Sequence, residues 1–184
     1  MKERIIMGVD PGTSITGYGI ILCEHKKMTL LTYGLIKLGD VDISHPLKLK
    51  KIYERVTSLI EEFHPDEFAI EAPFYGKNVQ AMLKLGRAQG VAIAAAIARD
   101  LPCTEYAPRK VKSAVTGSGA ASKEKVVGML ERLLNFKYEE AFLDASDGLA
   151  VAVCHHFQLL SPIPTGSAKS WEAFIKNNPD RVKK

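Results

Sequence analysis

The sequence predicts one α/β domain built on a mixed five-stranded sheet that is flanked by helices. Three β-prone segments follow one another at the start of the chain, and helices then alternate with short strands. This order is the first observation that supports the fold class, because such alternation is typical of α/β proteins. The second is length, since 184 residues suit a single domain with a sizeable core.

The first strand ends in a candidate site residue. An apolar run rich in β-branched residues, 5–9, is followed by one carboxylate, Asp10. Pro11 and Gly12 break the strand at once, so Asp10 is predicted to lie at the strand's carboxyl end. The next β-prone segment, 16–23, follows after too few residues for a helical crossover, which predicts an antiparallel hairpin.

The next three elements follow from composition and period. Residues 28–38 predict the third strand of an antiparallel meander. Apolar residues recur at spacings of three and four over residues 47–63, which predicts an amphipathic helix, and Pro46 suits its start. Residues 68–73 have the sequence FAIEAP, a buried-type strand in which the carboxylate of Glu71 is again followed closely by proline. Glu71 thus repeats the position of Asp10.

A long helix is predicted for residues 79–100, and residues 103–106 predict a further short strand. Gly86, Gly90 and Ala94 recur every four residues in this helix, which gives a smooth face that another backbone can approach closely. Two interpretations remain open. The face packs against the domain's own sheet, or it forms a contact between two copies of the chain.

The last part of the chain carries basic residues and two more helices. Residues 107–119 bring Arg109, Lys110 and Lys112 into a Gly-Ser-rich turn. Ser122 is a suitable cap for a helix over residues 123–136, and residues 144–160 predict a mostly apolar final helix. The domain is therefore predicted to span residues 1–160. Residues 161–184 begin as a linker-like stretch and continue as a basic tail that we expect to be mobile.

Composition and charge exclude several classes of protein. Hydrophobic residues make up 46% of the chain and charged residues 25%, which argues against a disordered or fibrous protein. The formal net charge of +4 indicates a polyanion partner only where the charges cluster. Three widely spaced cysteines without metal-ligand spacing predict free thiols. No signal peptide or membrane-spanning stretch is recognisable, so we expect a cytoplasmic protein without membrane contact.

Two further acids begin the final helix. Asp144 and Asp147 lie three residues apart, so both project from one face of its first turn. Taken alone, such a pair is explained by helix capping and by the helix dipole. Asp10 and Glu71 favour another interpretation, because acids that end apolar strands lie where α/β proteins place their ligands. If the final helix crosses those strand ends, the four carboxylates converge.

Four converging carboxylates repel one another and resist ionisation unless cations lie between them. Oxygen ligands without histidine or cysteine indicate Mg²⁺ or Mn²⁺, and two such ions about 4 Å apart can support phosphodiester cleavage. His155 lies nearly three turns beyond Asp144, so His155 and His156 are expected to occupy ordinary surface or helix-end positions. Gly148 is unfavourable for helix propensity, which makes close packing its candidate role.

Five segments carry a specific resemblance. In chain order they are GVDPGTSITGYG, FAIEAPFYGKN, LKLGRAQGVAIAAA, YAPRKVKSAVTG and DASDGLAVA. Together they resemble the RuvC family of Holliday-junction resolvases over about residues 4–156. The resemblance implies a ribonuclease-H-like fold and a homodimer that makes Mg²⁺-dependent, symmetric paired nicks in a four-way DNA junction. It also implies a role in homologous recombination and DNA repair beside a branch-migration motor complex.

The resemblance also assigns roles to individual residues. The family's metal-binding catalytic acids correspond to Asp10, Glu71, Asp144 and Asp147. Phe74 matches an aromatic residue that works at the junction centre, where it can stack on an unpaired base, although a buried core position is the alternative. Basic residues that match or adjoin the family's DNA contacts are Lys112, Lys123, Arg109 and Lys110. Further loop contacts to DNA are expected from Tyr75, Lys77 and Asn78.

The residues alone do not exclude three other functions. The segment DPGTSITGYG also resembles the phosphate-binding hairpin of sugar kinases and actin-like ATPases, although those proteins close two such domains around a nucleotide. A nuclease acting on RNA:DNA hybrids, or an integrase-like enzyme, would use similar acids. A non-catalytic junction-binding module would tolerate loss of charge at Asp10 or Glu71. No residue of the sequence indicates a preferred cleavage sequence.

Overall fold

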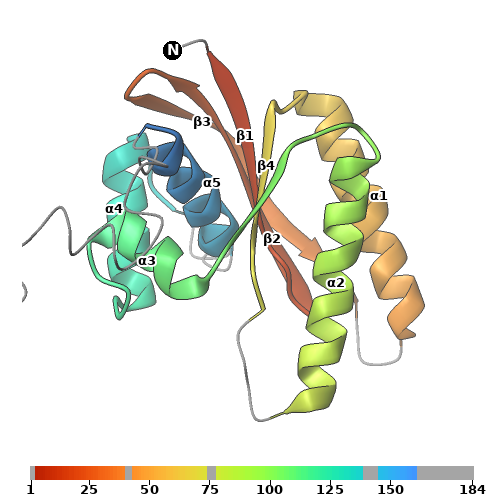
Figure 1. Cartoon of the computed structure of the whole chain (residues 1–184). Helices are drawn as coiled ribbons and strands as arrows, with labels where there is room; N and C mark the ends of the chain where they lie inside the picture. Colours follow the sequence, from red (N-terminus) through yellow and green to blue (C-terminus); the bar gives the residue numbers. More distant parts are fainter. Residues whose placement is uncertain (1–2, 40–42, 74–77, 139–144, 161–184) are drawn as a thin grey trace, which may run out of the picture.

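A five-stranded mixed sheet forms the centre of the computed structural model, which describes residues 3–39, 43–73, 78–138 and 145–160. The strands are β1 (Arg4–Asp10), β2 (Ile15–Glu24), β3 (Lys27–Lys37), β4 (Glu67–Glu71) and β5 (Cys103–Tyr106). The helices are α1 (His45–Phe63), α2 (Val79–Ile97), α3 (Pro108–Thr116), α4 (Lys123–Leu134) and α5 (Ala145–Leu160). Figure 1 shows α1 and α2 on one face of the sheet and α3, α4 and α5 on the other. The predicted fold class is confirmed.

The strand order is β3-β2-β1-β4-β5. β1 pairs antiparallel with β2, and β2 pairs antiparallel with β3, as their short connections predict. β1 and β4 run parallel, as do β4 and β5. The carboxyl ends of β1, β4 and β5 therefore meet at one edge of the sheet. Asp10 ends β1 and Glu71 ends β4 at this edge.

Two apolar clusters pack against the two faces of the sheet. Successive residues of a strand point to opposite faces, so Ile6 packs in the cluster with α5 while Met7 packs in the cluster with α1 and α2. α1 buries a single stripe, as its apolar spacing predicts. α5 is buried on nearly all sides, because it contacts the sheet as well as α3 and α4.

Glycines let α5 lie directly on the backbone of β1 and β2. A Cβ atom at Gly148 would lie 2.6 Å from backbone atoms of β2, and one at Gly19 would lie 2.5 Å from Leu149 Cα. A Cβ atom at Gly8 would clash with the backbone of α5. We call Gly8, Gly19 and Gly148 the glycine seam. Close packing is thus the role of Gly148, since a tightly packed interior leaves no room for a further methyl group.

The basic segment after β5 forms a helix that the sequence did not predict. α3 begins at Pro108, a residue that suits the first helical position, and ends where Gly117 adopts a φ of 79°. Only Val111 and Val115 of its nine residues are fully buried. An apolar pattern this narrow is difficult to distinguish from a turn, so no helix was predicted for this segment.

The small-residue face of α2 does not pack against the sheet, so that interpretation was wrong. Within the described part of the chain, a Cβ atom at Gly86 or Gly90 would meet no atom within 4 Å. The helix instead buries a different stripe, which consists of Ala88, Gln89, Ala92, Ala95 and Ala96. The open face also carries Leu83 and Ile97, which are 51% and 57% exposed. A contact between two copies through this face stays a prediction.

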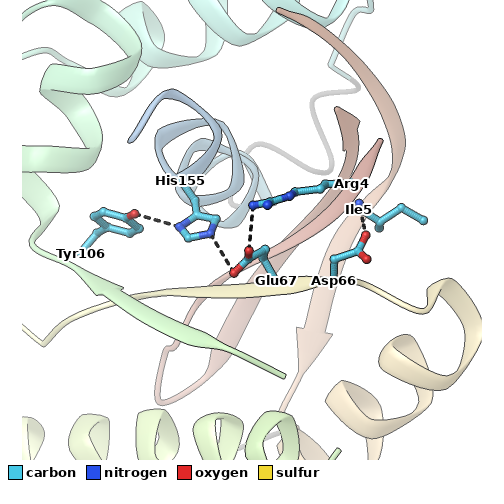
Figure 2. A network of polar contacts seen from close by, with 6 residues as sticks. All are labelled: Arg4, Ile5, Asp66, Glu67, Tyr106 and His155. Atoms are coloured by element: carbon cyan, nitrogen blue, oxygen red, sulfur yellow. Dashed lines mark hydrogen bonds and ion pairs between the residues drawn. The ribbon is translucent and has the colours of Figure 1, made fainter. Parts of the chain in front are cut away.

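His155 and His156 are buried, and not at the surface as expected. The expectation failed because α5 has almost no solvent-facing side. Figure 2 shows His155 between Tyr106 and Glu67: Tyr106 Oη lies 2.8 Å from His155 Nδ1, and Glu67 Oε2 lies 3.6 Å from His155 Nε2. Arg4 Nη1 pairs with Glu67 Oε1 at 3.0 Å. The network links β1, β4 and β5 to α5.

We expect the free energy of unfolding to fall as the pH is lowered from about 7 to about 5, in part through these histidines. Burial lowers the pKa of both His155 and His156 from 6.5. Below about pH 6.5 these histidines bind protons in the unfolded chain but not in the folded chain, so acid favours unfolding. Well above pH 6.5 they are neutral in both states, and their contribution to the pH dependence vanishes. Denaturant titrations of wild type and His156→Gln measure this dependence. The variant should lose less stability on acidification, and equal losses would contradict the assignment.

The cysteines are free thiols, as predicted. Burial raises the pKa of Cys23 to about 12 and that of Cys154 to about 11, so both thiols stay protonated at neutral pH. Within the residues that the structure describes, none of the helices has the length and apolar character needed to span a bilayer. Residues 161–184, the expected basic tail, lie outside the described residues.

Candidate active site

Three of the four predicted carboxylates line one cavity at the carboxyl edge of the sheet. Asp10 ends β1, Glu71 ends β4, and Asp147 lies in the first turn of α5. The cavity has a volume of about 280 Å³, and its other lining residues are Pro108, Val111, Lys112, Lys123, Val126 and Ala150. Asp144 lies outside the described residues. The structure therefore brings together acids that are separated by more than 130 positions in the sequence.

Strand register determines which way Asp10 and Glu71 point. The parallel pairing of β1 with β4 sets Val9 opposite Ile70, and both of these side chains pack in the cluster with α1 and α2. Because side chains alternate between faces, the next residues, Asp10 and Glu71, point to the α5 side. The glycine seam holds α5 close against that side, which brings Asp147 to the same cavity.

The backbone around these strand ends is hydrogen-bonded. Gly12 N donates to Thr16 Oγ1 at 3.3 Å across the turn after Asp10, and Thr16 itself is fully buried. Ala72 N donates to Tyr106 O at 2.8 Å, so the pairing of β4 with β5 extends one residue beyond Glu71. Both carboxylates therefore project from a fixed backbone, and not from loose loops.

Glu71 shows the electrostatic consequence of this convergence. Burial, followed by the charges of Asp10 and Asp147, raises the pKa of Glu71 from 4.5 to about 8, against an opposing effect of Lys112. At neutral pH the charged form of Glu71 is thus disfavoured when no further cation is near. A divalent cation at this position would reverse the effect, because it stabilises the ionised carboxylate.

Two lysines reach the same cavity from the neighbouring helices. Lys123, the first residue of α4, places its Nζ atom 3.2 Å from Asp147 Oδ2. The helix is capped by Ser122, whose hydroxyl accepts a hydrogen bond from Lys125 N at 3.4 Å. Lys112 projects from α3 and lines the cavity beside Glu71. The acids are therefore bordered by cationic groups that can hold a phosphate next to them.

The donor chemistry of the site fits a hard divalent cation. Carboxylate oxygens without histidine or cysteine suit Mg²⁺ or Mn²⁺. Across the described ranges, however, no group of three or more His, Cys, Asp or Glu side chains is arranged to hold a metal ion. Asp144, which precedes α5 directly, is the acid that the described ranges lack. The donor set and the raised pKa of Glu71 favour such a cation.

Two basic cavities flank the carboxylates on opposite faces of the sheet. The first has a volume of about 650 Å³ and is lined by Pro108, Arg109, Lys112, Ser118, Gly119 and Ala120. The second has a volume of about 460 Å³ and is lined by Thr13, Ser14, Ile43, Ser44, His45, Lys48 and Lys84. The sequence did not single out the second group, because its basic residues come from α1 and α2 and meet only through the packing of these helices.

The other predicted DNA contacts have different surroundings. Arg109 and Lys110 are exposed on α3, and of the two only Arg109 lines the first basic cavity. Asn78 caps α2, where its Oδ1 atom accepts a hydrogen bond from Ala81 N at 3.0 Å. Its contact with DNA stays a prediction. The remaining predicted loop residues, which lie outside the described ranges, are Phe74, Tyr75 and Lys77.

A mixed sheet with acids at the carboxyl ends of β1 and β4, and with a further acid on the helix that covers them, defines a nuclease of the ribonuclease-H-like class. The family model described as "Crossover junction endodeoxyribonuclease RuvC" matches residues 6–155. The chain belongs to the RuvC family of endodeoxyribonucleases.

Similar proteins support this membership over the whole chain. A crossover junction endodeoxyribonuclease RuvC from Porphyromonas gingivalis is 57% identical, with 99% of this chain and 98% of that protein covered. The corresponding protein from Cytophaga hutchinsonii is 56% identical, with coverage of 98% and 89%. Among solved structures, a Thermus thermophilus RuvC in complex with a Holliday junction substrate is 28% identical, with a TM-score of 0.79 and coverage of 85% and 95%.

Proposed function

We propose that this protein is a structure-selective endonuclease that resolves Holliday junctions by paired, symmetric, metal-dependent nicks in homologous recombination and DNA repair. The observation that carries the proposal is the cavity in which Asp10, Glu71 and Asp147 lie beside Lys112 and Lys123. Its support from relatives is specific, because a similar RuvC is described in complex with a Holliday junction substrate.

The residues proposed to hold the metal are Asp10, Glu71, Asp147 and Asp144. When bound, two Mg²⁺ ions, or Mn²⁺ ions in their place, supply activation of the attacking water and stabilisation of the leaving oxygen. The protein holds the phosphate in position. Lys112 and Lys123 line the same cavity and attract its negative charge. Val111, Val126 and Ala150 form the apolar part of the wall, which limits access of bulk water.

DNA is proposed to lie across the carboxyl edge of the sheet. The carboxylates repel DNA phosphates, whereas the basic cavities on either side attract them, so the backbone is anchored beside the reaction centre. The loop after Glu71 starts at the same edge and carries the proposed junction contacts Phe74, Tyr75, Lys77 and Asn78. An aromatic side chain at this place would stack on a base that the junction leaves unpaired.

Lys112→Ala is expected to weaken junction binding and to reduce its dependence on salt. Each lysine that neutralises a phosphate releases counterions, so its loss lowers the slope of log affinity against log salt by about one. Fluorescence anisotropy with labelled junctions at several salt concentrations measures this slope. Lys26→Ala is the matched control, because Lys26 lies in the turn after β2 at the opposite edge of the sheet. An unchanged slope in Lys112→Ala would remove this lysine from the phosphate contacts.

Two copies of the chain are proposed to act together. Paired nicks need two reaction centres, and each chain supplies one set of the four acids. The open face of α2 is the proposed contact, because its small residues, Gly86 and Gly90, let a second helix approach while Leu83 and Ile97 offer apolar surface. A branch-migration motor complex is the proposed further partner, and the cytoplasm is the proposed location.

Gly90→Arg is expected to convert dimers into monomers and paired nicks into single, uncoordinated nicks. The described part of the chain leaves room for a side chain at Gly90, so the fold should be retained while a charged group blocks the contact. Sedimentation velocity measures the association state. Gly128→Arg is the matched control, since a Cβ atom at Gly128 on α4 likewise meets no described atom within 4 Å. A dimer that survives in Gly90→Arg would place the contact elsewhere.

The function itself is tested by a nicking assay of the purified protein with Mg²⁺ or with EDTA. Four-way junctions, linear duplexes and RNA:DNA hybrids of the same sequence serve as substrates. Metal-dependent paired nicks on junctions alone are the expected result. Cleavage of hybrids in preference to junctions would favour the other nucleases of this fold. Tight junction binding without cleavage under any metal would favour a binding module.

A further inference from the structure

The elements that bring acids to the carboxylate cavity meet a second time, away from it. β1 and β4, which end in two of these acids, begin with Arg4 and Glu67. His155 lies in α5 about two turns beyond Asp147. Figure 2 shows Arg4, Glu67 and His155 in one network, which Tyr106 of β5 completes. Among the described residues that line the cavity, none belongs to this network.

The network lies on the α5 side of the sheet. Side chains alternate along a strand, so Glu67 and Glu71 share this face of β4. Tyr106 packs in the apolar cluster with α5, and its Oη atom lies 2.8 Å from His155 Nδ1. Only 4% of the His155 side chain is exposed. A polar contact that is shielded from water to this degree is stronger than one at the surface.

The ring of His155 has one arrangement that suits both of its polar neighbours. Carboxylate oxygens only accept, so the ring proton lies on Nε2, which faces Glu67 Oε2 at 3.6 Å. Nδ1 then accepts the hydrogen bond from Tyr106 Oη. Burial lowers the pKa of His155, against the opposing charge of Glu67, which favours this neutral ring. Arg4 Nη1 pairs with the other oxygen of Glu67 at 3.0 Å, so the carboxylate is held from two sides.

The spacing along α5 matches the spacing along β4. From Glu67 to Glu71 the strand rises about 13 Å, at roughly 3.3 Å per residue. From Asp147 to His155 the helix rises about 12 Å, at roughly 1.5 Å per residue. With His155 beside Glu67, Asp147 is thus brought level with Glu71. The contact at one end of α5 therefore sets the position of the acid at its other end.

Packing on the glycine seam offers little resistance to movement of α5 along its own axis. Gly8 and Gly148 lack the side chains that would otherwise interlock between sheet and helix. A hydrogen bond, by contrast, weakens steeply with distance and angle. Tyr106 supplies such a bond from a fixed place, because it pairs with Glu71 in the sheet and its carbonyl accepts from Ala72 N at 2.8 Å. The bond therefore ties α5 to a strand end that carries an acid.

We infer that Tyr106, His155 and Glu67 are positioning residues for the proposed cleavage reaction, because they fix α5 along the sheet and so keep Asp147 beside the acids of the strands. The inference rests on the proposed function, since it concerns the cation that these acids are proposed to hold. Groups of a functional site need to be placed to within about 0.5 Å. Loss of the network should therefore weaken cation binding even where the fold is retained.

Mn²⁺ titrations of the free protein test the inference, with the affinity measured by calorimetry. Tyr106→Phe removes only the hydroxyl that meets His155, and Glu67→Gln removes the charge on the other side of the ring. Tyr18→Phe is the matched control, because its hydroxyl also has a hydrogen bond, from Arg55 at 3.3 Å, yet Tyr18 packs with α1 and α2 on the other face. Denaturant unfolding of each variant, and junction cleavage at increasing Mg²⁺, are measured beside the titrations.

Tyr106→Phe should bind Mn²⁺ about tenfold more weakly, which is the lower end of the effect of groups that orient metal ligands. Excess Mg²⁺ should restore most of its cleavage, and Glu67→Gln should shift the metal dependence in the same direction. Tyr18→Phe should lose stability while its Mn²⁺ affinity equals that of wild type.

Unchanged Mn²⁺ affinity in both Tyr106→Phe and Glu67→Gln would make the network purely structural and overturn the inference. An equal loss of affinity in Tyr18→Phe would identify lowered stability as the cause and overturn it as well. A wild type that binds Mn²⁺ but cleaves no junction would overturn the proposed function alone, since the comparison of affinities is made without DNA.

Discussion

Asp10→Asn is expected to abolish junction cleavage while junction binding is kept or becomes tighter. The change removes one carboxylate oxygen from the proposed metal ligands and leaves the side chain almost the same size. Loss of an outer-sphere partner of a metal ligand already costs about 10- to 100-fold, so loss of a ligand should exceed this. Binding should not suffer, because a neutral Asn repels the DNA phosphates less than Asp10 does.

Cleavage and binding are measured on the same junction preparation, by nicking in Mg²⁺ and by anisotropy in Ca²⁺ or EDTA. Asp100→Asn is the matched control, because Asp100 is exposed in the turn after α2 and takes no part in the carboxylate cavity. Its cleavage should equal that of wild type. Full cleavage by Asp10→Asn would remove Asp10 from the proposed metal ligands, and joint loss of binding and cleavage would give Asp10 a structural role.

Gly148→Ala is expected to destabilise the protein by about 1 to 3 kcal/mol or more and to reduce cleavage strongly. Helix propensity alone predicts the opposite, since alanine is favoured over glycine by up to about 1 kcal/mol in a helix interior. A Cβ atom at Gly148 would lie 2.6 Å from the backbone of β2, which cannot move without displacing the sheet. Overpacking of this kind costs about 1 to 3 kcal/mol or more, and it would also shift Asp147.

Gly128→Ala provides the matched control for this prediction. Gly128 lies inside α4, and a Cβ atom there would meet no described atom within 4 Å. Propensity should dominate at this position, so the variant should gain up to about 1 kcal/mol. Thermal and denaturant unfolding of both variants give the comparison. Stabilisation by Gly148→Ala would show that α5 does not depend on this close contact.

The positions of Asp10 and Glu71 followed from the sequence because the information is local. An apolar run that ends in an acid and a proline identifies both the strand and its carboxyl end. The direction of these side chains was not predictable, since it depends on the register between β1 and β4. The position of Asp147 beside them was not predictable either, because it depends on the packing of α5 on the glycine seam. Roles for Lys112 and Lys123 came only from the family resemblance.

Other features escaped prediction for a common reason: they depend on what covers a segment. α3 buries only Val111 and Val115, so its sequence did not distinguish a helix from a turn. His155 was expected near solvent, yet α3 and α4 enclose the helix that carries it. The small residues Gly86 and Gly90 of α2 are typical of a packed helix face, yet no residue that the structure describes packs against them.

The contacts of α5 also determine when the surroundings of Asp10 and Glu71 are completed as the chain is synthesised. α5 is the final described helix, yet it contacts β1, β2, β3 and β4 as well as α3 and α4. A growing chain on the ribosome therefore exposes Asp10 and Glu71 long before the layer that completes their surroundings has been made. Because Asp147 lies in the first turn of α5, the carboxylate cavity is complete only once that helix has been synthesised and packed.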